Sequence, residues 1–392
     1  MSKAKKHYNI GLVGTRGGSM LQGFRDIENT TIAAVCDLDE SALNAFGDKA
    51  GVAPNMRFRV FEDMLAADID AVVIATPMQC HVPQAIAAML AGKHVLCEVP
   101  AAVTMDELWW LIETKEKTGC TYMMAENYCY TPAVQLVKAL RDAGYFGTPF
   151  YAEGEYLHEL DDHYLVTPGG LPTWRAFWQL GRRGSFYPTH SLGPVMEWFS
   201  GDRVMELSCF GTGGGYVRPQ YRQDELTVTM CRMASGALAK ITVACKAPRP
   251  HNMHAYLLQG TKGCYEAPRG LGDDHKIWLE GHPADGEPEK SKRWRSLWDF
   301  RCHLPERFLN PLKAAQNAGH QGGDYFMIQD FVDAMDSGEE PMANVYRAAE
   351  WTAVGLLSEL SVVNGGRAMD VPHFRKNMPG AVKRVAIRQR SL

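Results

Sequence analysis

The chain has no excess of charge of either sign and no long apolar run. Among 392 residues, 41 lysines and arginines stand against 45 aspartates and glutamates, a formal net charge of −4. This balance argues against a nucleic-acid or membrane-surface partner. No run of about 20 apolar residues occurs, so no segment is predicted to span a bilayer. Residues 1–7 are basic and lack an apolar stretch of signal-peptide length, and we therefore expect a cytoplasmic protein.

The ten cysteines contain no Cys-x-x-Cys spacing. A chain this long needs no disulfides to fold, so reduced thiols are expected, as in the cytoplasm. His158 and the run 161–163, Asp-Asp-His, offer nitrogen and oxygen donors for zinc, but the run is typical of a solvated loop and no distant third ligand can be identified. We predict no metal site. The length exceeds the roughly 250 to 300 residues of one hydrophobic core, which predicts two domains.

The N-terminal half begins with the pattern of a phosphate site. An apolar run over residues 8–13 ends at Gly14, and Arg16, Gly17 and Gly18 precede an amphipathic stretch. Glycine after a strand lets the backbone approach a pyrophosphate, and the following helix start offers free N–H groups. The glycine motif is imperfect, because Arg16 stands at its middle glycine.

A carboxylate follows at the expected distance. The second apolar run, residues 31–36, ends at Asp37, 23 residues beyond Gly14, close to the roughly 20 expected for the acid that binds the adenosine ribose. Leu38 follows instead of an arginine, and Asp37 would repel a 2′-phosphate, so NAD is favoured over NADP. The alternative is an exposed acid at a strand end.

Further strand patterns end in polar residues. The run 71–75 ends at Thr76-Pro77, a helix is expected over 84–91, and the run 94–97 ends at Glu98. This alternation predicts a doubly wound parallel sheet, an α/β Rossmann domain over residues 1–126. Because ligands lie at the carboxyl ends of such strands, these residues should surround one crevice.

Residues 127–392 have another pattern. A helix is expected over 132–144 and a strand from residue 149, and the runs 226–233, 237–245 and 255–260 are typical of long antiparallel strands. We predict an α+β domain with a large, mostly antiparallel sheet and helices on one face.

Two motifs carry a family resemblance. Glu98-Val99-Pro100 resembles the Glu-Lys-Pro motif of the glucose-fructose oxidoreductase and inositol dehydrogenase (Gfo/Idh/MocA) family of sugar dehydrogenases, with Val99 in place of the lysine that assists proton removal. Phe186 replaces the aspartate that usually stands four residues before the family histidine, here His190. The proton chemistry must therefore use other residues.

The block Tyr187-Pro-Thr-His190 closely resembles a motif of one branch of that family, the NAD-dependent glycosidases first known as α-N-acetylgalactosaminidases. Residues 98–102, 123–127, 154–158, 319–325 and 345–351 also resemble that branch. Ser191 replaces a glycine of the motif, and the glycine loop differs. The resemblance implies NAD-dependent chemistry on a carbohydrate substrate, and a homodimer or homotetramer that pairs through the C-terminal sheet.

The resemblance and the patterns together predict a site. The candidate catalytic residues are His190, Tyr187 and His158, since histidine exchanges protons near neutrality and a tyrosine can act as a base beside a cation or histidine. The predicted cofactor contacts are Gly14, Arg16, Gly17, Gly18, Asp37, Thr76, Pro77, His81, Glu98 and Asn127, and the predicted substrate contacts are Tyr128, Tyr156, Trp174 and His320. Purely structural roles remain possible for the histidines and for Tyr187. In that case His81 would cap the start of its helix, Asn127 would be a turn residue and Trp174 would pack in the core.

Three functions remain open on the sequence alone. The missing lysine and aspartate favour glycoside cleavage by transient oxidation at C3, loss of the C2 proton and elimination. The first alternative is a plain NAD-dependent sugar or cyclitol dehydrogenase. The second is a cofactor-binding sensor or partner protein without catalysis, which the joint presence of Tyr187, His190 and His158 disfavours. The sequence does not identify the sugar, its anomer or the leaving group.

Overall fold

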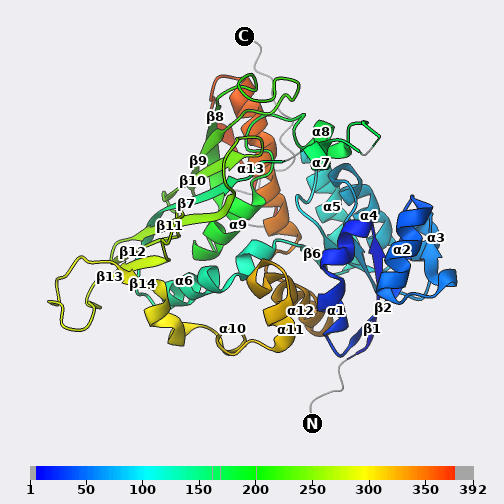
Figure 1. The fold of residues 1–392 in the computed structure, drawn as a ribbon, viewed down its shortest axis with the longest axis horizontal. Helices are drawn as coiled ribbons and strands as arrows, with labels where there is room; N and C mark the ends of the chain where they lie inside the picture. Colours follow the sequence, from blue (N-terminus) through cyan, green and yellow to red (C-terminus); the bar gives the residue numbers. More distant parts are fainter. Residues whose placement is uncertain (1–5, 161, 168, 200, 376–392) are drawn as a thin grey trace.

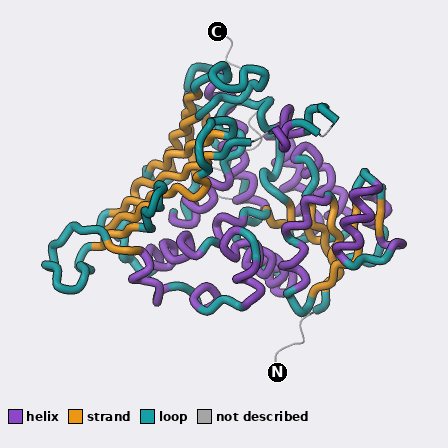
Figure 2. The backbone as a smooth tube through the Cα atoms, viewed as in Figure 1, coloured by secondary structure: helices purple, strands orange, loops and turns teal. Residues whose placement is uncertain are grey.

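The computed structural model describes residues 6–160, 162–167, 169–199 and 201–375. These residues form two sheets of different size, and Figure 1 shows the smaller one within the blue and cyan N-terminal part and the larger one in green and yellow. Figure 2 shows a layer of helices between the two sheets. In the described part of the chain, no helix is long and apolar enough to cross a membrane, and all ten cysteines are free thiols.

The small sheet has the predicted parallel topology. Within the described residues it has six strands in the order β3-β2-β1-β4-β5-β6, and each neighbouring pair is parallel. Strands buried on both faces are continuous apolar runs, and β4 is buried at all four positions. The strands are β1 (Tyr8–Val13), β2 (Thr30–Cys36), β3 (Arg57–Phe58), β4 (Ala71–Ile74), β5 (His94–Cys97) and β6 (Tyr122–Met124).

Helices cover both faces of this sheet: α1 (Leu21–Arg25), α2 (Glu40–Ala50), α3 (Phe61–Leu65), α4 (His81–Leu90) and α5 (Met105–Thr118). Local sequence sets the ends of α5. The Thr104 side chain accepts a hydrogen bond from the Glu107 backbone N–H, and the Glu107 carboxylate accepts one from the Thr104 backbone N–H, a capping box. Gly119, at φ 70°, ends the helix.

The large sheet is mostly antiparallel, as predicted. Among the described residues its order is β14-β13-β12-β11-β7-β10-β9-β8-β15, and the central pair of β7 and β10 is parallel. Its strands are β7 (Pro149–Leu157), β8 (Val204–Gly211), β9 (Thr227–Met233), β10 (Leu238–Ala244), β11 (Asn252–Gly260), β12 (Gly263–Glu266), β13 (Lys276–Leu279), β14 (Arg295–Ser296) and β15 (Met369–Asp370).

One face of the large sheet packs on helices α9 (Thr189–Trp198) and α13 (Val345–Val363), and α6 (Pro132–Asp142) packs on α9. Alternate residues of β10 point to this face, so Ala239, Ile241 and Val243 are buried. A Cβ atom at Gly154 would lie 2.2 Å from the Ser191 carbonyl oxygen, so glycine in β7 lets α9 approach closely. Pairing of subunits through the opposite face stays a prediction.

The last helices return to the N-terminal sheet. Helix α12 (Gly323–Ser337) packs on α1, where a Cβ atom at Gly23 would lie 2.4 Å from Ile328 Cδ1. The Met124 N–H donates to the Ala343 carbonyl, and the Ala101 N–H donates to the Thr352 hydroxyl. Residues more than 200 positions apart thus complete one core. The remaining short helices are α7 (Asp162–Leu165), α8 (Trp174–Trp178), α10 (Glu306–Leu309) and α11 (Lys313–Asn317).

Candidate active site

A crevice of about 710 Å³ lies at the carboxyl ends of the small sheet's strands, as the sequence predicts. Its N-terminal wall includes seven of the predicted cofactor residues: Gly14, Arg16, Asp37, Thr76, Pro77, His81 and Glu98. Its other wall comes from the C-terminal half of the chain and includes Trp174, Arg175 and Tyr187. The site is therefore formed between the two halves of the chain.

The glycine loop differs from the expected strand, glycine turn and amphipathic helix. Residues Thr15–Ser19 form a 3-10 turn, and α1 that follows has only five residues. Gly14 has a φ of 86°, and a Cβ atom there would lie 2.5 Å from the Ala75 carbonyl oxygen, so only glycine fits. Gly17 and Gly18 lie beside Ala75 and Phe46 and are not among the residues that line the crevice.

The Asp37 carboxylate is held by backbone donors. One oxygen accepts the Thr15 N–H at 3.0 Å and the other accepts the Asp39 N–H at 3.0 Å. Each carboxylate oxygen has a second lone pair, so Asp37 is oriented without being saturated. This geometry fits a ribose diol.

His81 does not cap its helix, so that alternative is wrong. Its Nδ1 lies 2.9 Å from the Pro100 carbonyl oxygen and its Nε2 lies 3.0 Å from the Thr76 carbonyl oxygen. The ring is buried, and burial lowers its pKa. A neutral imidazole has one N–H and donates to only one of these carbonyls. Both ring nitrogens face the backbone, so His81 offers a cofactor no nitrogen.

Beside the crevice, a buried acid pairs with a histidine. His190 Nδ1 lies 2.8 Å from Glu126 Oε1, and Glu126 is fully buried. A carboxylate can only accept, so Nδ1 donates and Nε2 is left as the basic nitrogen. The rings of Tyr128, Tyr156 and Tyr187 surround His190 with centroids 4.3, 5.2 and 5.3 Å away. The predicted residues His190, Tyr187, Tyr128 and Tyr156 are thus brought together.

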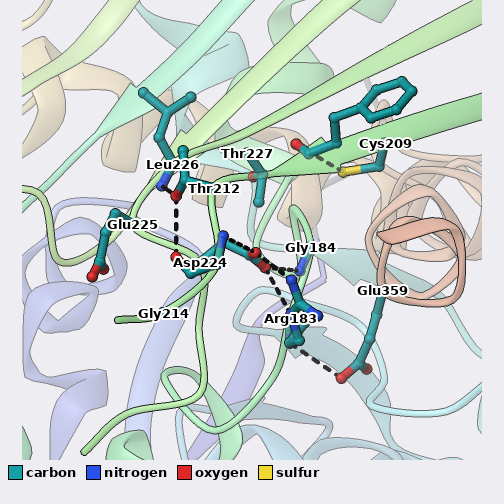
Figure 3. A network of polar contacts seen from close by, with 12 residues as sticks. Arg183, Gly184, Cys209, Thr212, Gly214, Asp224, Glu225, Leu226, Thr227 and Glu359 are labelled. Carbon is teal, nitrogen blue, oxygen red and sulfur yellow. Dashed lines mark hydrogen bonds and ion pairs between the residues drawn. The ribbon is translucent and has the colours of Figure 1, made fainter. Parts of the chain in front are cut away.

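The segment that carries Tyr187 and His190 is anchored by Asp224, as Figure 3 shows. Buried Asp224 accepts hydrogen bonds from Arg183 Nη2 at 2.7 Å, from the Gly184 N–H at 3.1 Å and from the Gly213 N–H at 2.9 Å. Gly184 has a φ of 71°, and a Cβ atom there would lie 2.7 Å from the backbone of α13. These contacts fix the loop just before Tyr187.

Tyr187 is not a ready base. Burial and the neighbouring Glu98 raise the pKa of its phenol, while Arg175 and Arg16 oppose the rise only in part. The phenol therefore keeps its proton near neutrality and can donate a hydrogen bond. The catalytic role of Tyr187 stays a prediction.

His158 lies at one side of this cluster. Its Nδ1 donates to the Glu159 carbonyl at 2.8 Å, and its ring lies 5.6 Å from Tyr156 and 4.4 Å from His251. Asp161, considered above as a zinc donor, lies outside the described residues. Among the described residues, no group of three or more His, Cys, Asp or Glu side chains could hold a metal ion.

Asn127 and His320 meet at the start of α12. Asn127 Nδ2 donates to Asp324 at 2.7 Å and lies 3.0 Å from His320 Nδ1, which in turn lies 3.0 Å from Asp324. The hydrogen bond to Asp324 raises the pKa of His320. His320 has a φ of 52°, which is unusual for a residue with a side chain. The pair lies beside Tyr128, whose ring is 5.6 Å from His320.

Sequence reasoning gave no role to Glu126, Arg175 or His254. His254, on β11, stacks on Tyr128 with ring centroids 4.5 Å apart. Burial and the nearby histidines His320, His190 and His275 lower its pKa to about 4. The junction Glu126-Asn127 was visible in the sequence, but no motif marks His254, which is a single histidine in a strand.

The two halves of the chain match two known families. Residues 8–126 match the oxidoreductase family with the NAD-binding Rossmann fold, and residues 133–379 match the C-terminal domain of glycosyl hydrolase 109. A glycosyl hydrolase family 109 protein of Solibacter usitatus is 32% identical over 94% of this chain and 88% of its own length. An α-N-acetylgalactosaminidase of Tannerella forsythia is 30% identical over 94% of this chain and 86% of its own.

Solved structures share the fold. Levoglucosan dehydrogenase in complex with NADH superposes with a TM-score of 0.75 at 19% identity, over 94% of this chain and 100% of that one. An oxidoreductase domain protein from Kribbella flavida gives a TM-score of 0.74 at 21% identity, with the same coverage.

Proposed function

Because the chain belongs to the glycosyl hydrolase 109 family and has the NAD-binding Rossmann fold of the oxidoreductase family, we propose that it cleaves a glycosidic bond with NAD as its cofactor. The observation that carries the proposal is the Glu126–His190 pair beside the strand-end crevice, in a chain where Val99 stands in place of the dehydrogenase lysine.

The residues present fit NAD. The crevice has a glycine at the end of β1 where no Cβ atom fits, an oriented carboxylate at the end of β2, and Arg16 beside them to meet a pyrophosphate. Asp37 would bind the adenosine ribose, and Glu98 and Tyr187 line the same crevice. When bound, NAD would supply the oxidation of a ring hydroxyl to a ketone and its later reversal.

The reaction requires three proton steps. Oxidation at C3 releases the hydroxyl proton, and the ketone then acidifies the hydrogen on C2. Loss of the C2 proton expels the C1 substituent, which takes up a proton as it leaves. Water adds to the resulting enone, and reduction of the ketone restores the C3 hydroxyl.

His190 and Tyr187 suit two of these steps. Glu126 holds the proton on His190 Nδ1, so Nε2 can accept the hydroxyl proton, and the buried carboxylate stabilises the imidazolium that forms. Tyr187, whose phenol keeps its proton, can donate a hydrogen bond to the departing oxygen. We assign the removal of the C2 proton to the side of the ring cluster around His190 where His158 and Tyr156 lie.

The test separates cleavage from net oxidation. Aryl glycosides should be cleaved without accumulation of NADH, and the sugar product formed in deuterated water should carry deuterium at C2. The NAD content of the denatured protein should be close to stoichiometric.

Stoichiometric NADH from free sugars, with neither glycoside cleavage nor C2 exchange, would refute the glycosidase proposal and leave a sugar or cyclitol dehydrogenase. Bound NAD with no turnover of any sugar would indicate a sensor or partner protein.

A further inference from the structure

A single loop of the large sheet is bound to two parts of the candidate active site. It covers residues 212–226, between β8 and β9. Its Asp224 accepts hydrogen bonds from the segment just before Tyr187 (Figure 3). Its Arg218 donates hydrogen bonds to the segment just after His158. The loop therefore sets how these two segments lie relative to each other.

The guanidinium of Arg218 contacts the two residues that follow His158. Its Nη1 donates to the Leu160 carbonyl oxygen, and its Nη2 donates to Glu159 Oε1 at 3.4 Å. The Glu159 carbonyl oxygen in turn accepts the hydrogen bond from His158 Nδ1 at 2.8 Å. A neutral imidazole that donates from Nδ1 accepts at Nε2. Arg218 therefore acts on the orientation and the tautomer of His158 through Glu159.

A buried lysine fixes the loop from inside. Lys246 is fully buried. Its Nζ donates at 3.1 to 3.2 Å to three carbonyl oxygens of the loop, those of Gly214, Arg218 and Tyr221. Its counter-charge is Glu225 Oε2, 2.9 Å away, and the other oxygen of Glu225 accepts two backbone N–H groups of the loop. Because these contacts hold the backbone at several points, the Arg218 side chain extends from a fixed position.

We propose that Arg218 is a positioning residue for removal of the C2 proton, and that Asp224 is its counterpart for oxidation at C3. This inference rests on the proposed function, which places His158 on the C2 side and His190 at the C3 hydroxyl. Neither Arg218 nor Asp224 is among the described residues that line the crevice, so each acts through the segment that it binds. A displacement of about 1 Å in a proton-transferring group costs about 10²-fold in rate.

Kinetic isotope effects separate positioning from a loss of folded protein. The aryl glycoside that the NAD-loaded enzyme cleaves fastest is prepared with deuterium at C2 or at C3. Arg218→Ala should lower kcat by about 10- to 100-fold and leave KM within a few-fold. The isotope effect at C2 should rise and that at C3 should fall, because removal of the C2 proton becomes rate-limiting. Asp224→Asn should shift the two isotope effects in the opposite direction.

Two further variants of the same loop complete the series. Arg218→Lys keeps the charge but has fewer donors, so it should recover part of the lost rate; if Arg218→Ala does not fold, this variant provides the comparison. Arg222→Gln, at an exposed position, is the matched control and should match wild type. A lower kcat in Arg218→Ala with both isotope effects unchanged would mean that Arg218 only stabilises the fold, and it would refute the proposal.

NMR with nitrogen-labelled histidine keeps this proposal separate from the proposed function, since it requires no turnover. His158 should be the Nδ1–H tautomer in wild type and a mixture of both tautomers in Arg218→Ala, and His158→Asn assigns its signal. If wild type cleaves no glycoside but the tautomer changes in this way, the positioning role stands and the glycosidase proposal fails. If neither the tautomer nor the isotope effects change in Arg218→Ala, the positioning role is wrong.

Discussion

Replacing His254 should make the protein less sensitive to acid. The folded-state pKa of His254, about 4, lies below the unfolded value near 6.5. As the pH falls through this interval, His254 is protonated in the unfolded chain but stays neutral in the folded chain. The free energy of unfolding therefore decreases as the pH decreases. From pH 7 to pH 5 the loss is about 2 kcal/mol, and it approaches about 3 kcal/mol at pH 4.

His254→Phe keeps the stacking on Tyr128 and removes the titrating group. Urea unfolding followed by tryptophan fluorescence at pH 7, 6 and 5 should show that wild type loses about 2 kcal/mol more than the variant between pH 7 and 5. His282→Phe, a replacement of an exposed histidine, is the control for loss of one imidazole. Equal pH dependence in wild type and His254→Phe would refute the reasoning.

Two further predictions concern the cofactor and the proton chemistry. Asp37→Ala should weaken NAD binding and reduce the discrimination against NADP, because the carboxylate held by Thr15 and Asp39 would no longer bind the ribose or repel a 2′-phosphate; unchanged discrimination by calorimetry would exclude Asp37 as the ribose ligand. His190→Ala and Tyr187→Phe should each lower turnover by about 10²-fold or more while the NAD content stays the same. Full activity in both variants would show that other residues transfer the protons, and His158 would then be the next candidate.

Much of the fold follows from local pattern. The apolar runs ending at Gly14, Asp37, Thr76 and Glu98 predict the parallel strands, since a strand buried on both faces has nowhere to place a polar side chain. The blocks around Val99 and His190 predict the family, and the matches over residues 8–126 and 133–379 confirm it. The roles of the site residues, the boundary after residue 126 and the oligomer stay predictions.

The contacts that define the site do not follow from local pattern. Glu126 and His190 are 64 residues apart, and α9 lies so close to Glu126 that a Cβ atom at Gly193 would be 2.9 Å from Glu126 Cγ. Gly17 and Gly18 resemble phosphate-loop glycines, but the 3-10 turn places them beside Ala75 and Phe46. Arg175 lies near aromatic residues in the sequence, and no local feature shows that it lines the crevice.

The packing of α12 and α13 on the N-terminal sheet has a consequence for folding during synthesis. The first six strands leave the ribosome long before residues 323–363 exist, yet Met124, Ala101 and Gly23 take their packing or hydrogen-bond partners from that late segment. Until that segment is synthesised, part of the apolar surface of the nascent Rossmann half stays exposed. Chains in such a state are bound by chaperones and are prone to aggregate. A chain whose synthesis stops before α13 contains every residue of the Rossmann half, but this half lacks part of its packing partners.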